Sequence, residues 1–408
     1  MSKNAKKPIT GYVMSGDTPV ARFDGSRVTP ILENRTPLCF RRSGDLVDWL
    51  EHRAVDRHRT NSRVLKRILR LGDTSDLNTA LRVHGATVTD NYWIRIDGEN
   101  VSWNQVLFSK DYFADVALRC GVGDFAKEFS YHQLNTPTPE LTNTGSFEKC
   151  WRLVNGGWTM FKASTPKERF SEIFIYRLCD KMGLPAAEYY AKGGYTATPD
   201  FTAGKTNFEP MRYLVQDDED YGRNYEVLRS FGKSLERQYL DILFMDALTL
   251  NPDRHTENYG ILRDRETGEI LSMAPNFDNN LSLISRGYGM DGKPPANLLI
   301  GFFHELLEDK NIKYQYPALP NELELRAIIR DAAGGLDVDQ EYVFQMIQTN
   351  YENLTSLGCK KKRRASGLAA SAYKQQPSEL ERAARELIDK ADTILNTESD
   401  EPGDQYGE

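Results

Sequence analysis

Three polar side chains in the middle of the chain have the types and the spacing that phosphoryl transfer needs. Asp253 lies five residues before Asn258 in the stretch Asn251–Gly260, which reads NPDRHTENYG. A second aspartate, Asp278, ends the segment Ala274–Asp278, which reads APNFD. In protein kinases an aspartate at this spacing receives the proton of the acceptor hydroxyl, and the asparagine and a later aspartate hold Mg²⁺ against the ATP phosphates. The pattern therefore predicts a phosphotransferase whose catalytic base is Asp253 and whose metal ligands are Asn258 and Asp278.

The sequence between Asn258 and Asp278 predicts a β-hairpin that would bring the two metal-binding side chains together. Tyr259–Leu262 and Glu269–Met273 have strand composition, and Arg263–Gly268 between them has the composition of a turn. The ends of a hairpin lie close together, so the two side chains could share one ion. Oxygen ligands, few of them from protein, suit Mg²⁺. The alternative is a surface loop rich in Asn and Asp that has no function.

A helix is expected directly before this loop. Leu235–Leu250 carries apolar residues at helical spacing, which indicates one buried face. A rigid helix that leads into a loop can hold a catalytic side chain in a fixed place. Asp246 interrupts the apolar stretch, and two interpretations remain open: it braces the loop by accepting backbone hydrogen bonds, or it faces water.

A kinase also needs a lysine for the phosphates and an acid that holds this lysine. Trp158–Ala163 reads as a strand with Lys162 near its end, and a helix is expected at Pro166–Met182. Glu168 completes a capping box at the start of that helix and is therefore occupied. Glu172, one helical turn later, is the preferred ion-pair partner of Lys162. The alternative is that both are ordinary surface charges.

Turn residues precede the strand that leads to this lysine. Within Leu141–Val154, Gly145 and Ser146 lie where backbone N–H groups could approach the phosphates of a nucleotide. The segment contains neither G-x-G-x-x-G nor G-x-x-x-x-G-K-[ST]. A plain hairpin turn is the competing interpretation.

The two downstream motifs resemble those of a known kinase family. Asn251–Gly260 is similar to the N-x-D-R-H-x-x-N-[FY]-G loop of the HipA-like Ser/Thr kinases, a bacterial and phage group often found in toxin–antitoxin modules. Ala274–Asp278 resembles the A-P-x-[FY]-D segment of the same family. The resemblance covers roughly residues 140–350 and is specific at these two motifs.

This resemblance implies an ATP- and Mg²⁺-dependent Ser/Thr protein kinase. Asp253 would be the catalytic aspartate, Asn258 and Asp278 the metal ligands, and Lys162 the lysine that contacts ATP. Family members autophosphorylate a serine of the phosphate loop, which makes Ser146 a candidate by position. The S-x-x-G-x-Q-x-K loop that is usual in the family is not recognisable here. The expected partners are ATP, a protein substrate and, by the same resemblance, an antitoxin-like protein.

The implied fold is α+β and bilobal, like a protein kinase, with a small β-rich lobe and a large helical lobe. The expected domains are an N-terminal α+β accessory domain at 1–135, a nucleotide-binding lobe at 136–216, a helical catalytic lobe at 217–397 and an acidic disordered tail at 398–408. The Pro/Thr-rich stretch Gln133–Leu141 marks the first boundary.

The composition of the chain limits the class of protein. A length of 408 residues, with 39% hydrophobic and 27% charged residues, is typical of a soluble protein of two or three domains. The net charge of −7 argues against direct nucleic-acid binding. The chain has no apolar run of transmembrane length and no signal-peptide core, and its five cysteines lack zinc-site spacing. These features predict a cytoplasmic protein without membrane association.

Several further elements are expected outside the motifs. Helices are predicted at Asp45–Ala54, Ser62–Arg70 and Ser378–Asn396, and Met211–Val215 reads as a strand beside an adenine-binding hinge near 201–215. One polar helix face is basic and is interpreted as solvated, rather than as a surface for nucleic acid or an acidic partner: Arg63, Lys66, Arg67 and Arg70. The basic run Lys360–Arg364 is likewise interpreted as a solvated loop.

Two other classes of function stay open from the sequence. A pseudokinase or interaction module would keep the fold without turnover. A kinase for a small molecule or a lipid head group would use the same apparatus on another hydroxyl.

Overall fold

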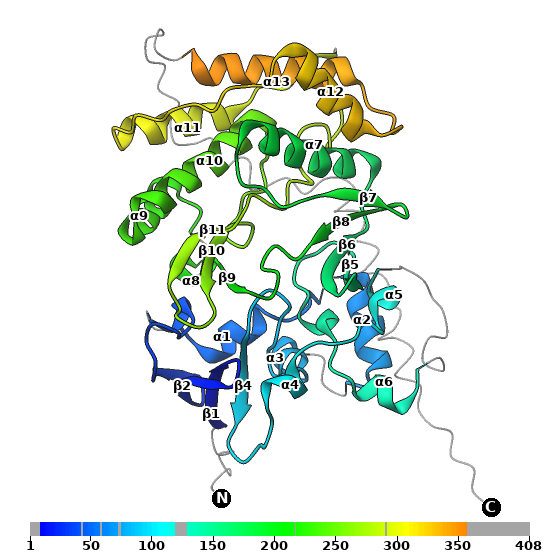
Figure 1. The fold of residues 1–408 in the computed structure, drawn as a ribbon, viewed down its shortest axis with the longest axis vertical. Helices are drawn as coiled ribbons and strands as arrows, with labels where there is room; N and C mark the ends of the chain where they lie inside the picture. The colour runs from blue at the N-terminus through cyan, green and yellow to red at the C-terminus, as the bar shows by residue number, and fades with distance from the viewer. Residues whose placement is uncertain are drawn as a thin grey trace, which may run out of the picture. The chain divides into compact units, whose positions relative to one another are not determined.

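Three antiparallel sheets hold the strands of the described residues, and helices cover them, which gives a mixed α+β architecture (Figure 1). The computed structural model describes residues 9–41, 44–57, 59–71, 75–118, 129–216, 218–289 and 292–356. The expected helix at Ser378–Asn396, the basic run Lys360–Arg364 and the acidic tail at 398–408 lie outside the described residues. No helix in the described ranges is long and apolar enough to cross a membrane.

The first sheet belongs to the N-terminal part of the chain. Its strands, in the order β3-β2-β1-β4, are β1 (Thr10–Ser15), β2 (Thr18–Asp24), β3 (Arg27–Pro30) and β4 (Tyr92–Ile96). Short helices follow in this part of the chain, and α5 and η3 among them contact β5 of the second sheet. They are η1 (Leu38–Arg41), α1 (Leu46–Glu51), α2 (Thr60–Ile68), α3 (Asp76–Leu81), α4 (Trp103–Val106), α5 (Ala114–Leu118), α6 (Tyr131–Asn135) and η3 (Pro139–Thr142). Val13, Phe23 and Trp49 lie in its buried core.

The second sheet carries the lysine that the sequence singled out. Its order is β5-β6-β8-β7, with β5 (Lys149–Val154), β6 (Gly157–Lys162), β7 (Tyr190–Lys192) and β8 (Tyr195–Pro199). Helix α7 (Pro166–Met182) follows β6 and begins with the predicted capping box between Thr165 and Glu168. Gly183 ends this helix in the left-handed conformation, at φ 71°, which glycine adopts without strain.

The third sheet includes the hairpin that follows the loop Asn251–Gly260. Its order is β11-β10-β9, with β9 (Thr206–Pro210), β10 (Gly260–Asp264) and β11 (Ile270–Met273). The hairpin of β10 and β11 is the one predicted between Asn258 and Asp278. The predicted helix before the loop is present as α10 (Lys233–Thr249), and its apolar face is buried.

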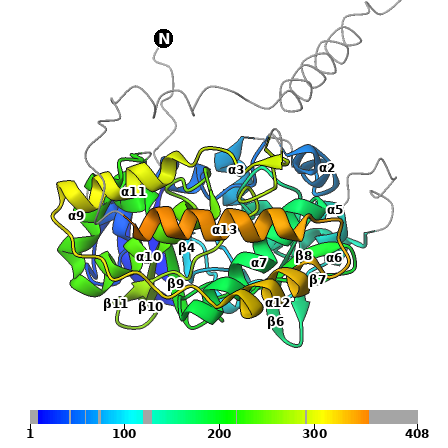
Figure 2. The ribbon, with the colours of Figure 1, turned by 90° about the horizontal axis from the view of Figure 1, so that it is seen from above.

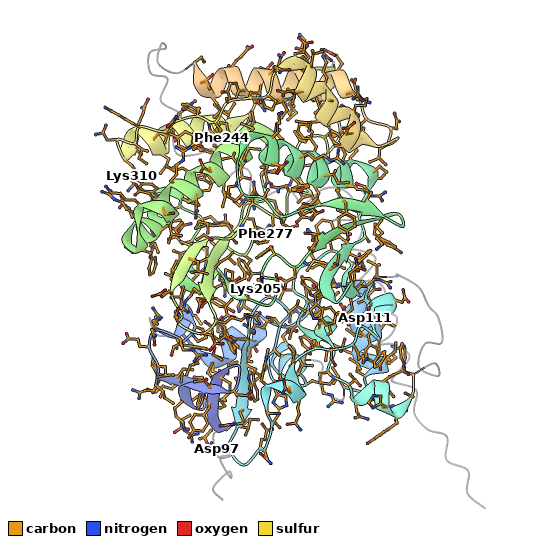
Figure 3. The ribbon with its side chains drawn as sticks, in the orientation of Figure 1. Asp97, Asp111, Lys205, Phe244, Phe277 and Lys310 are labelled. Carbon is orange, nitrogen blue, oxygen red and sulfur yellow. The ribbon has the colours of Figure 1, made fainter. Side chains whose placement is uncertain are left out.

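A layer of helices packs on α7 and α10 (Figure 2). It contains α9 (Tyr221–Phe231), α11 (Leu298–Asp309), α12 (Glu322–Ala333) and α13 (Gln340–Thr355). In Figure 3, Phe244 of α10 lies inside this layer, whereas Phe277 lies between the helices and the strands below them. The helical layer and the N-terminal sheet lie on opposite sides of the other two sheets (Figure 1).

Two predictions for individual segments were wrong. Met211–Val215 is not a strand, since Arg212–Val215 forms the short helix α8 and the strand is β9, just before it. The polar face of α2 is not solvated throughout, because Lys66 is 3% exposed and lies 3.6 Å from Asp76. Both errors come from tertiary packing, which overrides the local pattern.

Candidate active site

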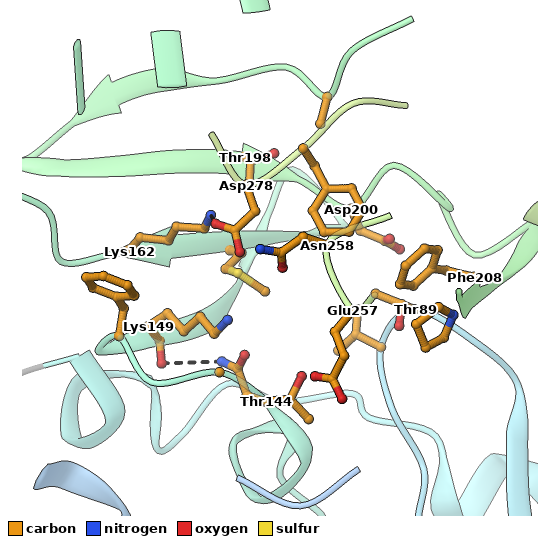
Figure 4. A pocket seen from close by; sticks show the side chains of 18 of the residues that line it. Thr89, Thr144, Lys149, Lys162, Thr198, Asp200, Phe208, Glu257, Asn258 and Asp278 are labelled. Carbon is orange, nitrogen blue, oxygen red and sulfur yellow. Dashed lines mark hydrogen bonds and ion pairs between the residues drawn. The ribbon is translucent and has the colours of Figure 1, made fainter. Parts of the chain in front are cut away.

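The structure brings all the predicted site residues to the wall of one cavity of about 240 Å³. Figure 4 shows Lys162, Asn258 and Asp278 facing the same space, with Lys149 opposite them. Asp253 lines this cavity as well. The predicted hairpin is the reason that Asn258 and Asp278 meet, because β10 and β11 return the chain to its starting point.

Lys162 lies between two carboxylates. Its ammonium is 2.8 Å from Glu172 Oε1 and 2.6 Å from Asp278 Oδ1. Glu168 is occupied by the helix cap, where its Oε2 accepts from the Thr165 backbone N–H at 2.7 Å. The predicted ion pair of Lys162 and Glu172 is therefore present, while its role in nucleotide binding stays a prediction.

The charges in this triad set the state of the Asp278 carboxyl. Burial alone would raise its pKa, but the ammonium groups of Lys162 and Lys149 hold the pKa well below its usual range. Burial lowers the pKa of Lys162, and the carboxylates of Asp278 and Glu172 more than reverse this, so its pKa lies well above the usual value. Asp278 is thus a carboxylate and Lys162 an ammonium across the ordinary pH range.

Asn258 and Asp278 are suited to hold a magnesium ion. The Asn258 amide donates its Nδ2–H to the backbone oxygen of Asp253 at 3.0 Å, which leaves its Oδ1 as an acceptor. Asp278 accepts a hydrogen bond from Lys162 through Oδ1, and its Oδ2 is the oxygen that could bind a metal ion. Within the described residues no group of three or more His, Cys, Asp and Glu side chains is placed to bind a metal. Two protein oxygens fit Mg²⁺, which takes its other ligands from phosphate and water.

Asp253 lies at the turn of the loop after α10. Its backbone N–H donates to Asn251 Oδ1 at 3.2 Å, and its backbone oxygen accepts from the His255 N–H at 2.9 Å. Burial raises the pKa of the Asp253 carboxyl; the nearby His255 opposes this rise and Asp278 adds to it. A carboxyl with a raised pKa is a better proton acceptor than one in water.

Arg254 holds the loop in place, and the sequence did not assign it a role. Its guanidinium donates to Asp246 Oδ2 at 2.9 Å and Oδ1 at 2.8 Å. The same side chain donates to the backbone oxygens of Asn258 and Phe277, each at 2.7 Å. Arg254 therefore joins helix α10, the catalytic loop and the segment that carries Asp278. The only signal in the sequence was its position next to Asp253.

Asp246 is 2% exposed, so it does not face water. It braces the loop, as the first of its two interpretations had it. The donors differ from those expected, because they are the side chains of Arg254 and Asn251 rather than backbone N–H groups.

Lys149 adds a second cation that the sequence did not single out. Lys149 on β5 pairs directly with Lys162 on β6, and side chains of an opposed antiparallel pair lie on the same face of the sheet. Its ammonium points into the cavity (Figure 4), and in the described part of the chain no acceptor lies within hydrogen-bond distance of it. Burial lowers the pKa of Lys149 to about 8. The sequence signal that could have identified Lys149 was its position on the strand opposite Lys162.

Gly145 and Ser146 also line the cavity, in the loop that precedes β5. Gly145 has φ +95°, and a Cβ at this position would lie 2.6 Å from Lys149 Nζ. The positive φ favours glycine here, and any larger residue would displace the Lys149 ammonium from its present position. Ser146 is exposed at the tip of the loop.

The other end of the cavity is aromatic. The rings of Phe201, Phe208 and Phe277 contact one another with centroids 5.4–5.5 Å apart, and all three line the cavity. Phe201 and Phe208 fall in the range where the adenine hinge was expected. Residues of the N-terminal part, among them Thr89 and Asp90, complete this wall, which the sequence did not predict.

The described residues thus form a mixed α+β fold in which one cavity collects the predicted site residues. No protein-family model matches the chain, and no curated protein matches it. Two solved structures are similar. A chain of the Shewanella oneidensis MR-1 toxin–antitoxin complex of HipA, HipB and operator DNA has a TM-score of 0.51 at 13% identity, covering 85% of this chain and 97% of its own. The Helicobacter pylori proinflammatory kinase CtkA has a TM-score of 0.35 at 16% identity, covering 50% of this chain and 90% of its own.

The likeness to the Shewanella chain supports a HipA-like kinase fold and shows the fold alone. The likeness to CtkA is too low in TM-score to carry an argument.

Proposed function

We propose that this protein is a HipA-like Ser/Thr kinase that transfers the γ-phosphoryl group of ATP to a protein hydroxyl. The observation that carries the proposal is the position of Lys162 between Glu172 and Asp278, in the same cavity as Asp253 and Asn258. These residues are distant in the sequence, so chance proximity of ordinary surface charges does not explain their arrangement around one cavity.

Each end of the cavity has a chemical role in the proposal. The aromatic end, with Phe201 and Phe208, holds the base of ATP, and Lys162 and Lys149 face the phosphates. Asn258 and Asp278 would hold Mg²⁺, which would supply positive charge against the phosphate oxygens.

Phosphoryl transfer then needs only a positioned acceptor. The acceptor oxygen attacks the γ-phosphorus, the bond to the oxygen that bridges the β- and γ-phosphorus breaks, and ADP leaves. The acceptor proton passes to the Asp253 carboxylate, whose raised pKa suits this task. Arg254 keeps the backbone of the loop fixed during transfer through its bonds to Asp246 and Asn258.

Labelled ATP·Mg²⁺ incubated with the protein and a cell extract tests the proposal directly. Label on proteins, lost in the Asp253→Asn variant, supports it. Label on small molecules or lipids would assign the same chemistry to another acceptor. Nucleotide binding without any transfer would identify a pseudokinase and overturn the proposal.

The proposal includes a protein partner of the antitoxin kind, because the Shewanella HipA of similar fold was determined with HipB. Expression in a bacterial host tests the toxin part. We expect the wild-type chain, but not Asp253→Asn, to arrest growth. Equal growth of the two strains at equal protein levels would remove the toxin–antitoxin assignment and leave the kinase proposal in place.

A further inference from the structure

A buried arginine of the N-terminal part holds both ends of the loop that crosses the cavity. Arg59, immediately before α2, donates through Nη1 to the backbone oxygen of Asn143 at 2.7 Å and through Nη2 to that of Lys149 at 2.5 Å. These two carbonyls flank the five residues of the loop at 144–148. The Arg59 residue is 2% exposed.

A second set of bonds ties the same two ends together. Asn143 donates through Nδ2 to the backbone oxygen of Lys149 at 3.3 Å and to Glu140 Oε2 at 3.2 Å. Glu140 in turn accepts the backbone N–H of Trp151 through Oε1 at 2.7 Å. The loop is thus closed at its base by side chains rather than by strand pairing alone.

The use of Arg59 is unusual for a buried cation, because its two terminal donors serve carbonyl oxygens and not a carboxylate. Burial lowers the pKa of Arg59, and the nearby carboxylate of Glu140 opposes this shift without accepting a bond from the terminal donors. Burial of a cation without a directly bonded carboxylate is costly, so such a group persists where its geometry matters. A guanidinium has a planar fork of donors that can span two acceptors at a fixed separation. The fork therefore sets the distance between the two ends of the loop.

The position of this base fixes what the loop presents to the cavity. Lys149 is both one end of the loop and the cation that faces the phosphates, so a shift of its backbone moves its ammonium. Gly145 crosses directly over the same ammonium. An open base would release Gly145 and Lys149 from the cavity together.

We propose that Arg59 is a positioning residue that clamps the base of the 144–148 loop and thereby holds Lys149 and the loop backbone at the nucleotide phosphates. The N-terminal part of the chain is then a component of the nucleotide site and not a separable accessory domain. This inference rests on the proposed function for the identity of the ligand, but the clamp itself is a property of the chain without nucleotide.

Arg59→Lys is the first test, since lysine keeps the charge but cannot span both carbonyls. Loss of one or two charge-assisted bonds is expected to raise the KM for ATP and the Kd for Mg·ADP about tenfold, while kcat changes less than about threefold. Arg35→Lys is the matched control, because Arg35 also donates to a backbone oxygen, that of Arg265 at 3.2 Å, but does not line the cavity.

Hydrogen exchange of the nucleotide-free protein separates this inference from the proposed function. The amides of 144–148 should exchange faster in Arg59→Lys than in the wild type or in Arg35→Lys, whether or not the protein transfers phosphate. Unchanged loop protection in a folded Arg59→Lys protein would overturn the clamp.

If Arg59→Lys does not fold, Asn143→Ala is the second test of the clamped base, because it removes the two bonds that the Asn143 side chain donates and keeps the backbone acceptor for Arg59. It should raise loop exchange and the Kd for Mg·ADP in the same way. Wild-type values for both in this variant would also overturn the clamp.

Discussion

At the scale of single residues, the cavity contains two carboxyl groups, Asp278 and Asp253, whose pKa values are shifted in opposite directions. Asp278 is held as a carboxylate by Lys162, and its pKa is far below its usual range. Asp253, by contrast, has a raised pKa because it is buried. Two carboxyl groups with opposite pKa shifts in one cavity fit the two roles proposed for them: Asp278 as a metal ligand and Asp253 as a base.

This difference predicts distinct outcomes for two variants. Asp253→Asn keeps the shape of the side chain and should lower turnover about 10²–10⁴-fold with nucleotide affinity largely unchanged. Asp278→Ala should instead weaken nucleotide binding in the presence of Mg²⁺. Calorimetric titration with Mg·ADP and steady-state phosphotransfer measure the two effects. Near wild-type transfer by Asp253→Asn would show that another group receives the proton.

Because the pKa of Lys149 is lowered, we expect nucleotide binding to depend on pH. Burial lowers its pKa to about 8, so the ammonium is largely present at pH 7 and mostly lost at pH 9. Because phosphate binds the protonated form, the Kd for Mg·ADP should rise about tenfold between these pH values. In Lys149→Met the Kd should be higher at pH 7 and nearly independent of pH. A wild-type profile in this variant would show that Lys149 does not contact the phosphates.

At the scale of elements, the sequence was informative wherever the signal is local. The capping box at Thr165 and the stop at Gly183 fixed both ends of α7, and from the occupied Glu168 the choice of Glu172 followed. The β10–β11 hairpin was also local, and it explains how Asn258 meets its metal-binding partner.

The sequence did not indicate contacts between residues that lie far apart along the chain. Nothing near Arg59 indicates that its donors lie against a loop about eighty residues later, at Asn143 and Lys149. The helix at Arg212–Val215 was missed for a similar reason, because its apolar residues suit a strand and only packing selects the helix.

For the loop at 144–148 we predict that phosphorylation of Ser146 regulates the kinase. Ser146 is exposed at the tip of a loop that lines the cavity, and a phosphoryl group there would add about −1.5 to −2 charge next to the ATP phosphates. Autophosphorylation of Ser146 should therefore switch the kinase off. Intact-mass and peptide mapping after incubation with ATP·Mg²⁺ detect it, with Asp253→Asn as the inactive control. An active enzyme that carries no phosphate at Ser146 would remove this regulation and leave the kinase proposal standing.

At the scale of the whole described region, the N-terminal sheet is joined to the catalytic hairpin by buried charge. Arg263 on β10 and Glu209 on β9 form an ion pair whose side chains are 0% exposed. Glu209 also accepts the hydroxyl of Tyr92 at 3.0 Å and the backbone N–H of Leu38 at 2.7 Å. Arg263 donates to the backbone oxygen of Thr36 at 3.0 Å. The boundary expected near residue 135 stays a prediction, and these bonds argue that the two sides unfold together.

Breaking this pair should therefore destabilise both sides at once. Arg263→Met leaves Glu209 charged and buried without its partner, which should lower the free energy of unfolding by about 3–5 kcal/mol. The double variant Arg263→Met with Glu209→Leu should recover much of this stability, because no charge is left unpaired. Urea unfolding is followed by two probes. Tryptophan fluorescence reports the N-terminal part through Trp49, Trp93 and Trp103 and the second sheet through Trp151 and Trp158, and far-ultraviolet circular dichroism reports chiefly the helices. We expect one coincident transition in the wild type and in each variant, shifted to lower urea most strongly in Arg263→Met. Separate transitions from the two probes would show that the tryptophan-containing parts and the helical layer unfold independently. Equal stability of the single and double variants would show that the unpaired Glu209 carboxylate carries no cost.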